Sequence, residues 1–443
     1  MFLSDQQIEK LAPNSTAFAA GKKLSLPSKW DSFAHSQRAL WGEIRGSGTK
    51  PYLTKVDREE LAFNCSCPSR QFPCKHAIAL LLLGEQLPVS AEPAWVQEWL
   101  DKRRQKAVSP PKEEKDYTPA ELEKRDREKA NRLESRMAKV DAGVLELSRW
   151  LEDLVRVGFL DLPNRQLQDF ENMAARMVDA QAGGLANWIR SLGQLPFGDP
   201  LTWQKEAMDL IGKLNLLAQT WQNYAFLSPE WQHSLKDLVG WAQSPKELET
   251  DANAFVVEDE WLVIGQEKEN QEDLEIERTW LWGCHSGQTA LILQFGNKFS
   301  PIARQLIPGS MIAAQLAFFP GVLPLRAVIR TQKGLLEALP SPPKFAADWP
   351  SLLSRQAAQL TIHPWLNNQA YLLAQARIIY EKDQWYMADI KGNLLPLIKD
   401  FSTVKLMYFL ALTGHTPIDL ALVIRHQRVL PLGVFQFPQY LIL

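Results

Sequence analysis

The chain has few cysteines, no long apolar run and almost no net charge. Only four cysteines occur in 443 residues, and three of them lie between positions 65 and 74. This clustering in a reducing compartment favours a metal site over a network of disulfides. The net charge of −2 gives no overall attraction to nucleic acid or to anionic lipid.

Membrane and export signals are also missing. The most apolar stretches are IALLLLGEQL, which is too short to span a bilayer, and MIAAQLAFFPGVLPL, which Pro320 and Pro324 interrupt. The opening residues MFLSDQQIEK show no basic segment followed by an apolar run and a small-residue cleavage site. We therefore expect a cytoplasmic protein.

Motifs of the common enzyme classes are absent as well. The sequence has no GxxxxGK(S/T), no GxGxxG after a strand and no GxSxG. Cys284-His285 lacks a neighbouring acid–base pattern, so we expect packing there rather than catalysis. The remaining histidines have no metal spacing: His233, His363, His415 and His426. We expect a protein that is not an enzyme, while a site assembled from scattered C-terminal residues stays an open alternative.

The composition is that of a globular protein with several domains. Apolar residues make up 46% of the chain and charged residues 23%, and the 16 Trp favour packed helical layers. We predict an α+β multidomain fold that combines a small ββα zinc module, a charged linker helix, a helical middle and a mixed β-rich C-terminal region. The predicted boundaries are 1–100 (motif core 41–87), 101–139, 140–250 and 251–443.

Local patterns set these boundaries. A hairpin is predicted over 41–57, a short strand over LAFNCSC, and a helix over HAIALLLLGEQL that ends near Gly84. Residues 101–140 hold 13 Lys+Arg and 9 Asp+Glu, and SPPKEEKDYTP within them should be extended and mobile. A helix should then begin at Pro119, behind the capping residue Thr118.

In the rest of the chain, the spacing of apolar residues changes once, from helical to strand-like. Apolar residues recur at helical spacing from about 140 to 250, with a stop at Gly183-Gly184. From about 254 onward, strand-like runs alternate with polar or Gly turns. The acidic run 267–277 is most simply a solvated hairpin loop, and docking of a basic partner there is the alternative.

The strongest chemical signal is the stretch Cys65-Ser-Cys67-Pro-Ser-Arg-Gln-Phe-Pro-Cys74-Lys-His76. Cys65 and Cys67 are two apart at a strand end, so both thiolates can reach one ion. Cys74 and His76 cannot both ligate from inside a regular helix, so Cys74 should lie just before the helix and His76 in its first turn. Three thiolates and one imidazole form a tetrahedral set suited to one structural Zn²⁺.

The predicted zinc site is closed. All four positions are filled by protein atoms, which leaves no coordination site for water or substrate and argues against a catalytic metal. The formal charge of the site would be −1, and Lys75 and Arg70 could offset it. Incidental cysteines with a helix-capping histidine are the alternative interpretation.

This pattern resembles the SWIM zinc finger, whose signature is Cys-x-Cys, a variable gap and Cys-x-His. WGEIRGSG, PYLTKVD and AFNCSCPSRQFPCKHAIALLLL resemble the bacterial version. The resemblance implies a ββα module with Cys65, Cys67, Cys74 and His76 as zinc ligands, and an association with DNA binding or protein interaction. In bacteria it further implies an association with MoxR-type AAA ATPases and von Willebrand A-domain proteins.

Two functions therefore compete. The first is a non-enzymatic interaction protein, a protein-binding component of such a complex. The second is a DNA- or RNA-binding protein that uses basic residues around the finger. Residues 1–100 hold 11 Lys+Arg against 10 Asp+Glu, which is little excess for tracking phosphates. The candidates for a basic face are Lys22, Lys23, Lys29, Arg38, Arg45, Lys50, Lys55, Arg70 and Lys75, extended by Arg103, Arg104 and Lys106.

Overall fold

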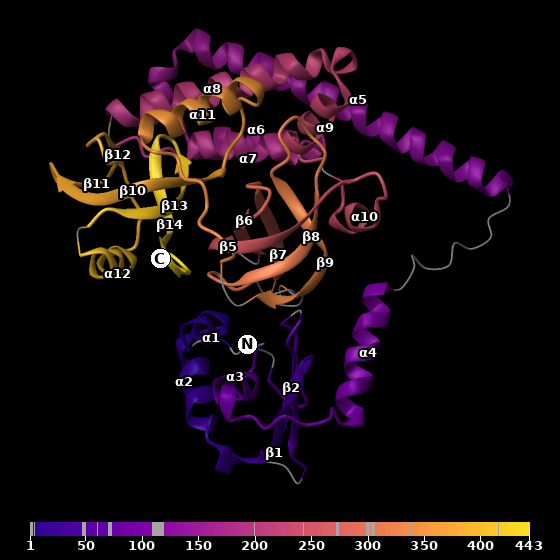
Figure 1. Cartoon of the computed structure of the whole chain (residues 1–443). Coiled ribbons are helices and arrows are strands. Elements are labelled where there is room, and N and C mark those ends of the chain that lie inside the picture. Colours follow the sequence, from indigo (N-terminus) through magenta and orange to yellow (C-terminus); the bar gives the residue numbers. More distant parts are fainter. Residues whose placement is uncertain are drawn as a thin grey trace.

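The computed structural model shows four parts: an N-terminal module, a helical bundle, a closed β-barrel and a six-stranded sheet (Figure 1). The barrel lies between the N-terminal module and the bundle, with the sheet beside it. This arrangement confirms the predicted α+β multidomain fold. The residues described are 3, 5–46, 50–59, 61–69, 73–108, 119–198, 200–241, 243–271, 274–297, 302, 306–336, 339–414 and 416–443.

In the N-terminal module, which ends at Val108, one apolar helix packs against a sheet of short strands. Its four-stranded antiparallel sheet has the order β1-β2-β3-β4, with bounds Trp30–His35, Ala39–Ile44, Tyr52–Asp57 and Phe63–Cys65. The predicted hairpin is confirmed, since β2 pairs with β3 from Ala39↔Asp57 to Ile44↔Tyr52. The helices are α1 (Asp5–Leu11), α2 (Ser15–Leu24), α3 (Lys75–Leu83) and α4 (Ala94–Val108), with 3-10 turns η1 (Pro27–Lys29) and η2 (Gly84–Gln86).

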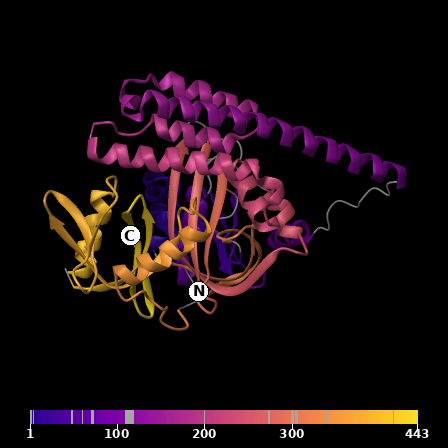
Figure 2. The same ribbon diagram turned by 90° about the horizontal axis from the view of Figure 1, so that it is seen from above.

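A single long helix, α5 (Pro119–Val157), leads into the bundle and begins at the predicted proline. Its buried residues repeat at intervals of four and three: Val140, Val144, Leu147, Leu151 and Leu154. This stripe packs against α6 and α8, while the N-terminal part of α5 extends beyond the bundle in both views (Figures 1 and 2). The predicted extended segment before Pro119 lies outside the described residues.

The remaining bundle elements are η3 (Phe159–Asn164), α6 (Leu167–Asp179), α7 (Gly183–Gly193), α8 (Pro200–Gln222), η4 (Tyr224–Phe226) and α9 (Pro229–Leu238), with α10 (Pro245–Thr250) after them. The glycine pair predicted as a helix stop instead opens α7, because α6 has already ended at Asp179. Gly184 is needed for close packing, since a Cβ there would overlap the carbonyl oxygen of Leu238 at the end of α9.

Five strands close into a barrel in the order β5-β6-β7-β9-β8. Their bounds are Phe255–Gln271, Leu274–Gly283, Thr289–Asn297, Met311–Phe318 and Arg326–Leu336 for β5 to β9. The expectation of a solvated loop over 267–277 is wrong, because the described part of this run lies in the paired strands β5 and β6. Glu277 is only 1% exposed and pairs with Lys268 at 3.1 Å, since its side chain is on a covered face of β6.

The C-terminal sheet has the order β12-β11-β10-β13-β14-β15. The strands are β10 (Ala370–Glu381), β11 (Gln384–Ala388), β12 (Leu394–Pro396), β13 (Ile418–Arg425), β14 (Arg428–Gln436) and β15 (Gln439–Ile442). One face packs against α11 (Trp349–Ile362) and α12 (Thr403–Thr413). The other face covers the outside of the barrel, where Trp280 and Trp282 meet Leu372 and Val423.

None of the helices in the described residues combines the length and the apolar character needed to cross a membrane.

Candidate zinc site

The four predicted ligands come from two adjacent elements. Cys65 ends β4, where it pairs with Thr54 of β3, and Cys67 follows two residues later. Cys74 is the N-cap of α3 and His76 is the second residue of that helix. The predicted placement of Cys74 before the helix and His76 in its first turn is thus confirmed.

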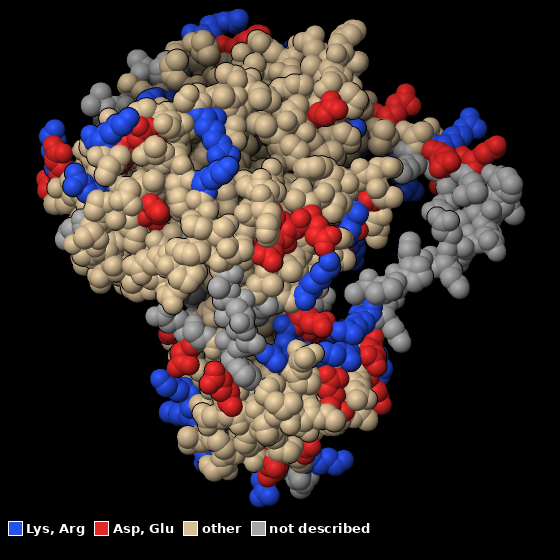
Figure 3. All heavy atoms as spheres, viewed as in Figure 1, with Lys and Arg blue, Asp and Glu red and all other residues tan. Residues whose placement is uncertain are grey.

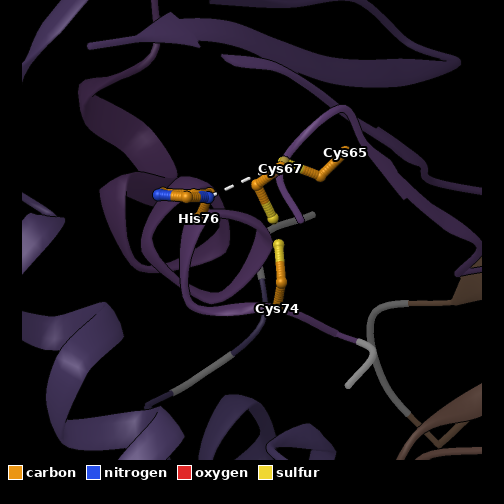
Figure 4. A group of neighbouring side chains, drawn as sticks. All are labelled: Cys65, Cys67, Cys74 and His76. Atoms are coloured by element: carbon orange, nitrogen blue, oxygen red, sulfur yellow. Dashed lines mark hydrogen bonds between the residues drawn. The ribbon is translucent and has the colours of Figure 1, made fainter. Parts of the chain in front are cut away.

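The ligand atoms converge on one point. The three sulfurs and one imidazole nitrogen all lie within 4.8 Å of one another, and Cys65 Sγ is 3.7 Å from His76 Nδ1 (Figure 4). In a tetrahedral zinc site with bonds of 2.0–2.3 Å, ligand atoms are roughly 3.4–3.8 Å apart. The donor set therefore fits one Zn²⁺ with small adjustments of side-chain torsion, and Nδ1 is the His76 atom that faces the sulfurs.

The surroundings of the site are mostly dry. Cys65, Cys74 and His76 are buried, while Cys67 is half-buried. The Tyr52 ring lies 5.2 Å from the His76 ring, and Thr54 Oγ1 is 3.2 Å from Cys65 Sγ. These neighbours hold the ligand side chains in place, as expected for a structural site.

The acidities of the thiols show what a bound divalent cation would change. Hydrogen bonding from Cys74, with further bonds from His76 and Thr54, lowers the pKa of Cys65 to about 3 against the opposing effect of burial. The Cys65 thiolate and burial in turn raise the pKa of Cys74, and burial raises the pKa of Cys67. Without a cation the charge of one thiolate opposes the next; a bound Zn²⁺ removes that penalty and allows all three to ionise.

Helix α3 is held tightly enough to fix half of the ligand set. All but one of its residues from His76 to Leu83 are buried, and a Cβ at Gly21 of α2 would overlap the side chain of Ile78. The helix ends at Gly84, which has a φ of 48°, as the sequence predicts. Lys75 is exposed at the helix start, and Arg70 lies outside the described residues.

The structure places an acid beside His285 that sequence spacing did not reveal. Asp259 Oδ1 accepts a hydrogen bond from the His285 backbone and lies 2.9 Å from Nδ1, while Oδ2 accepts from the Ser286 backbone. The pair comes together only because β5 and β6 are neighbouring strands. The carboxylate braces the β6–β7 turn, and Cys284 beside it packs against the barrel–sheet core, where burial raises its pKa to about 12.

Among the described residues, the cluster of Cys65, Cys67, Cys74 and His76 is the only group of three or more potential metal ligands that could hold an ion. His233, His363 and His426 are not part of any such group, and His415 lies outside the described residues. The site and its fold define a zinc-finger protein with one structural zinc.

Family comparisons agree with this class. Residues 64–84 match the SWIM zinc finger, and residues 135–239 match the SWIM-associated four-helix bundle domain. The second match runs from α5 into α9 and so covers the bundle described above. The chain therefore contains a SWIM zinc finger, followed by a SWIM-associated helical domain. Neither the curated proteins nor the solved structures compared gave a match to the chain.

Proposed function

We propose that this protein is a non-enzymatic, zinc-stabilised component of a protein complex. The observation that carries the proposal is the ligand set, in which Cys65, Cys67, Cys74 and His76 can together fill all four positions around a zinc ion. Zinc in such a site stabilises the fold and presents a surface, because no position is left for an activated water.

The barrel supports the same choice over nucleic-acid binding. Five-stranded Greek-key barrels of the OB type bind oligonucleotides on the face of their second and third strands. In this barrel those strands are β6 and β7, and their outer face is packed against the C-terminal sheet through Trp280, Trp282 and Leu291. Arg425 adds a bond of 2.6 Å to Glu267 across this contact. The corresponding surface is therefore already occupied within the chain.

The candidate arginines of the N-terminal module that the structure describes are paired with acids. Arg45 lies 2.8 Å from Asp31, and Arg104 lies 3.0 Å from Glu59. Lys55 donates to the Trp95 carbonyl and lies over the Trp95 ring. Figure 3 shows charges of both signs mixed where the module meets the rest of the chain. Such mixing lowers the field available to attract phosphates.

Two further candidate arginines also pair with acids, whereas most of the candidate lysines are exposed. Arg38 pairs with Glu92 and Asp101, and Arg103 with Asp57. Lys22, Lys23, Lys29, Lys50 and Lys75 are exposed, while the side chain of Lys106 lies outside the described ones. Nucleic-acid binding through these lysines is the competing function, and it predicts a steep dependence on salt.

The resemblance to bacterial SWIM proteins supplies the partner class for this proposal: a MoxR-type AAA ATPase or a von Willebrand A-domain protein. The candidate contact surface is the arm of α5 that precedes Arg136, the residue that lies over the Trp241 ring at 4.5 Å where the helix meets the bundle. Leu133 on this arm is 50% exposed. An exposed Leu on a projecting helix can enter an apolar groove of a partner.

The test is a binding titration of the zinc-loaded chain against a purified ATPase and A-domain protein from its own organism. Leu133→Ser should weaken the complex about tenfold. Val178→Ser is the matched control, because Val178 is also 50% exposed but lies on α6. No complex with either partner would reject this partner class. Salt-sensitive oligonucleotide binding by the intact chain would favour the competing function.

A further inference from the structure

The segment between β7 and β8 connects two cores that belong to different parts of the chain. Leu306 is 3% exposed and lies in the barrel interior with Trp261 and Val263. Its neighbour Ile307 is 1% exposed and lies in the core of the N-terminal module. Two consecutive side chains thus point into two hydrophobic cores, one on each side of the contact.

The barrel holds this segment rigidly. Gly309 N donates to Val263 O at 2.8 Å, and Val263 N donates to Ser310 O at 2.9 Å. Gln266 Nε2 bonds Leu306 O at 3.1 Å, and Ser310 Oγ bonds Ile307 O at 2.7 Å. Because these bonds fix the turn to β5, the side chain of Ile307 has a defined position relative to the barrel.

On the other side, Ile307 enters the core that the zinc ligands help to form. That core contains Cys65 and Cys74 together with Ala77 and Ile78 of α3. In small metal modules, metal binding and folding of the core are one process. The apolar site that receives Ile307 therefore forms only when the zinc ligands are held together.

In the described part of the chain, a hydrogen bond also joins the barrel to the module. Gln332 Nε2 on β9 donates to the Glu59 carbonyl at 2.8 Å. Beside this bond the two parts leave a cavity of about 230 Å³, lined by Leu40, Val56 and Leu61 on one side and by Lys333 on the other. The buried Ile307 therefore contributes apolar packing at a contact that also contains this open space.

We propose that zinc binding and docking of the barrel on the N-terminal module are one coupled equilibrium. The metal organises the core that receives Ile307, and the docked Ile307 in turn strengthens the hold on the metal. Linkage requires that the two effects be equal in size. A change in zinc occupancy would then alter how the barrel, and the sheet packed on it, are held relative to the finger.

Zinc affinity of the full chain, measured by competition with a colorimetric chelator, tests the coupling. Ile307→Ala should weaken zinc binding by a factor of about 5–150, the usual range of coupling between sites. Ile312→Ala is the matched control, because Ile312 is also 1% exposed but lies inside the barrel. Its zinc affinity should stay within about twofold of the parent chain. An unchanged affinity in folded Ile307→Ala would overturn the proposal.

Hydrogen exchange on the unsubstituted chain gives a second readout that does not depend on a variant folding. Removing zinc with a chelator should speed exchange at the Gly309 and Ser310 amides, because the undocked turn keeps its bonds to Val263 and Ile307 but loses the burial of Ile307 that stabilises it. Amides of α6 and α7 in the bundle should keep their protection. Equal protection of Gly309 and Ser310 with and without zinc would also overturn the proposal, whatever the outcome with Ile307→Ala.

Discussion

The N-terminal module and the β-rich half, which comprises the barrel and the C-terminal sheet, have cores of different composition. The module surrounds one apolar helix, α3, with short strands, and its core includes the ligands Cys65 and Cys74. The β-rich half instead buries three tryptophans that are at most 2% exposed: Trp261, Trp280 and Trp349. Its described residues contain no cluster of potential metal ligands. The stability of the first region should therefore follow zinc activity, whereas that of the second should follow buried aromatic area.

Loss of one zinc ligand should separate the two regions most sharply. Cys74→Ser should abolish stoichiometric zinc and unfold most of the module, because zinc contributes about 10–16 kcal/mol in isolated zinc-finger peptides. The strands of the barrel and of the C-terminal sheet should keep their hydrogen-exchange protection. Elemental analysis and exchange measured segment by segment provide the check.

Cys284→Ser is the control for that experiment, since Cys284 lies on the barrel away from the ligands. It should retain one zinc per chain. Full zinc occupancy in a Cys65/Cys67 double variant would refute the assignment of the site.

A substitution at the barrel–sheet contact should have the opposite effect: the β-rich half should lose stability while the N-terminal module keeps its zinc. Trp280 is fully buried, donates from Nε1 to the Asn368 carbonyl at 2.7 Å and lies under Arg425. Trp280→Ala should cost about 3–5 kcal/mol of unfolding free energy and leave zinc stoichiometry unchanged. Chemical denaturation followed with a zinc assay measures both. A zinc loss as large as that of Cys74→Ser would erase the contrast between the regions.

The fold of the module could be predicted from the sequence because its sequence signals are local. The Cys-x-Cys and Cys-x-His pairs, the hairpin over 41–57 and the helix ending at Gly84 each depend on residues within a few positions. The same holds for the start of α5 at Pro119. Each of these features can be recognised without knowing what packs against it.

The β-rich half was predicted only as a mixed region, because its organisation depends on distant pairing. Closure of the barrel requires β7 to pair with β9 in parallel, between Leu291 and Arg326. Assignment of strands to the barrel or to the sheet depends on which face meets which partner. The contact of Asp259 with His285 and the placement of Ile307 in the module core are likewise set by tertiary structure, with no signal in nearby sequence.

The bundle offers a smaller test of a metal-independent core. Gly184→Ala should destabilise the chain by about 1–3 kcal/mol, because the new Cβ overlaps the Leu238 carbonyl and the overlap must be relieved by backbone movement. Gly183→Ala, with open space around its Cβ, is the matched control. Thermal unfolding of the two variants should differ. Equal stability would indicate that α7 and α9 adjust freely.

The smallest effect is expected at the turn braced by Asp259. Burial raises the pKa of this carboxyl, but hydrogen bonds from Ser286 and His285 outweigh burial and lower it below its ordinary value. A lowered pKa in the folded state gives stability that is present above the unfolded value of about 3.9 and is lost as pH falls through the folded value. Asp259→Asn should therefore cost about 1 kcal/mol near pH 6. This difference from the parent chain should shrink below about pH 4. Urea unfolding of both chains across that range measures it, and a difference that stays constant down to pH 3 would show that the charge of Asp259 does not brace the turn.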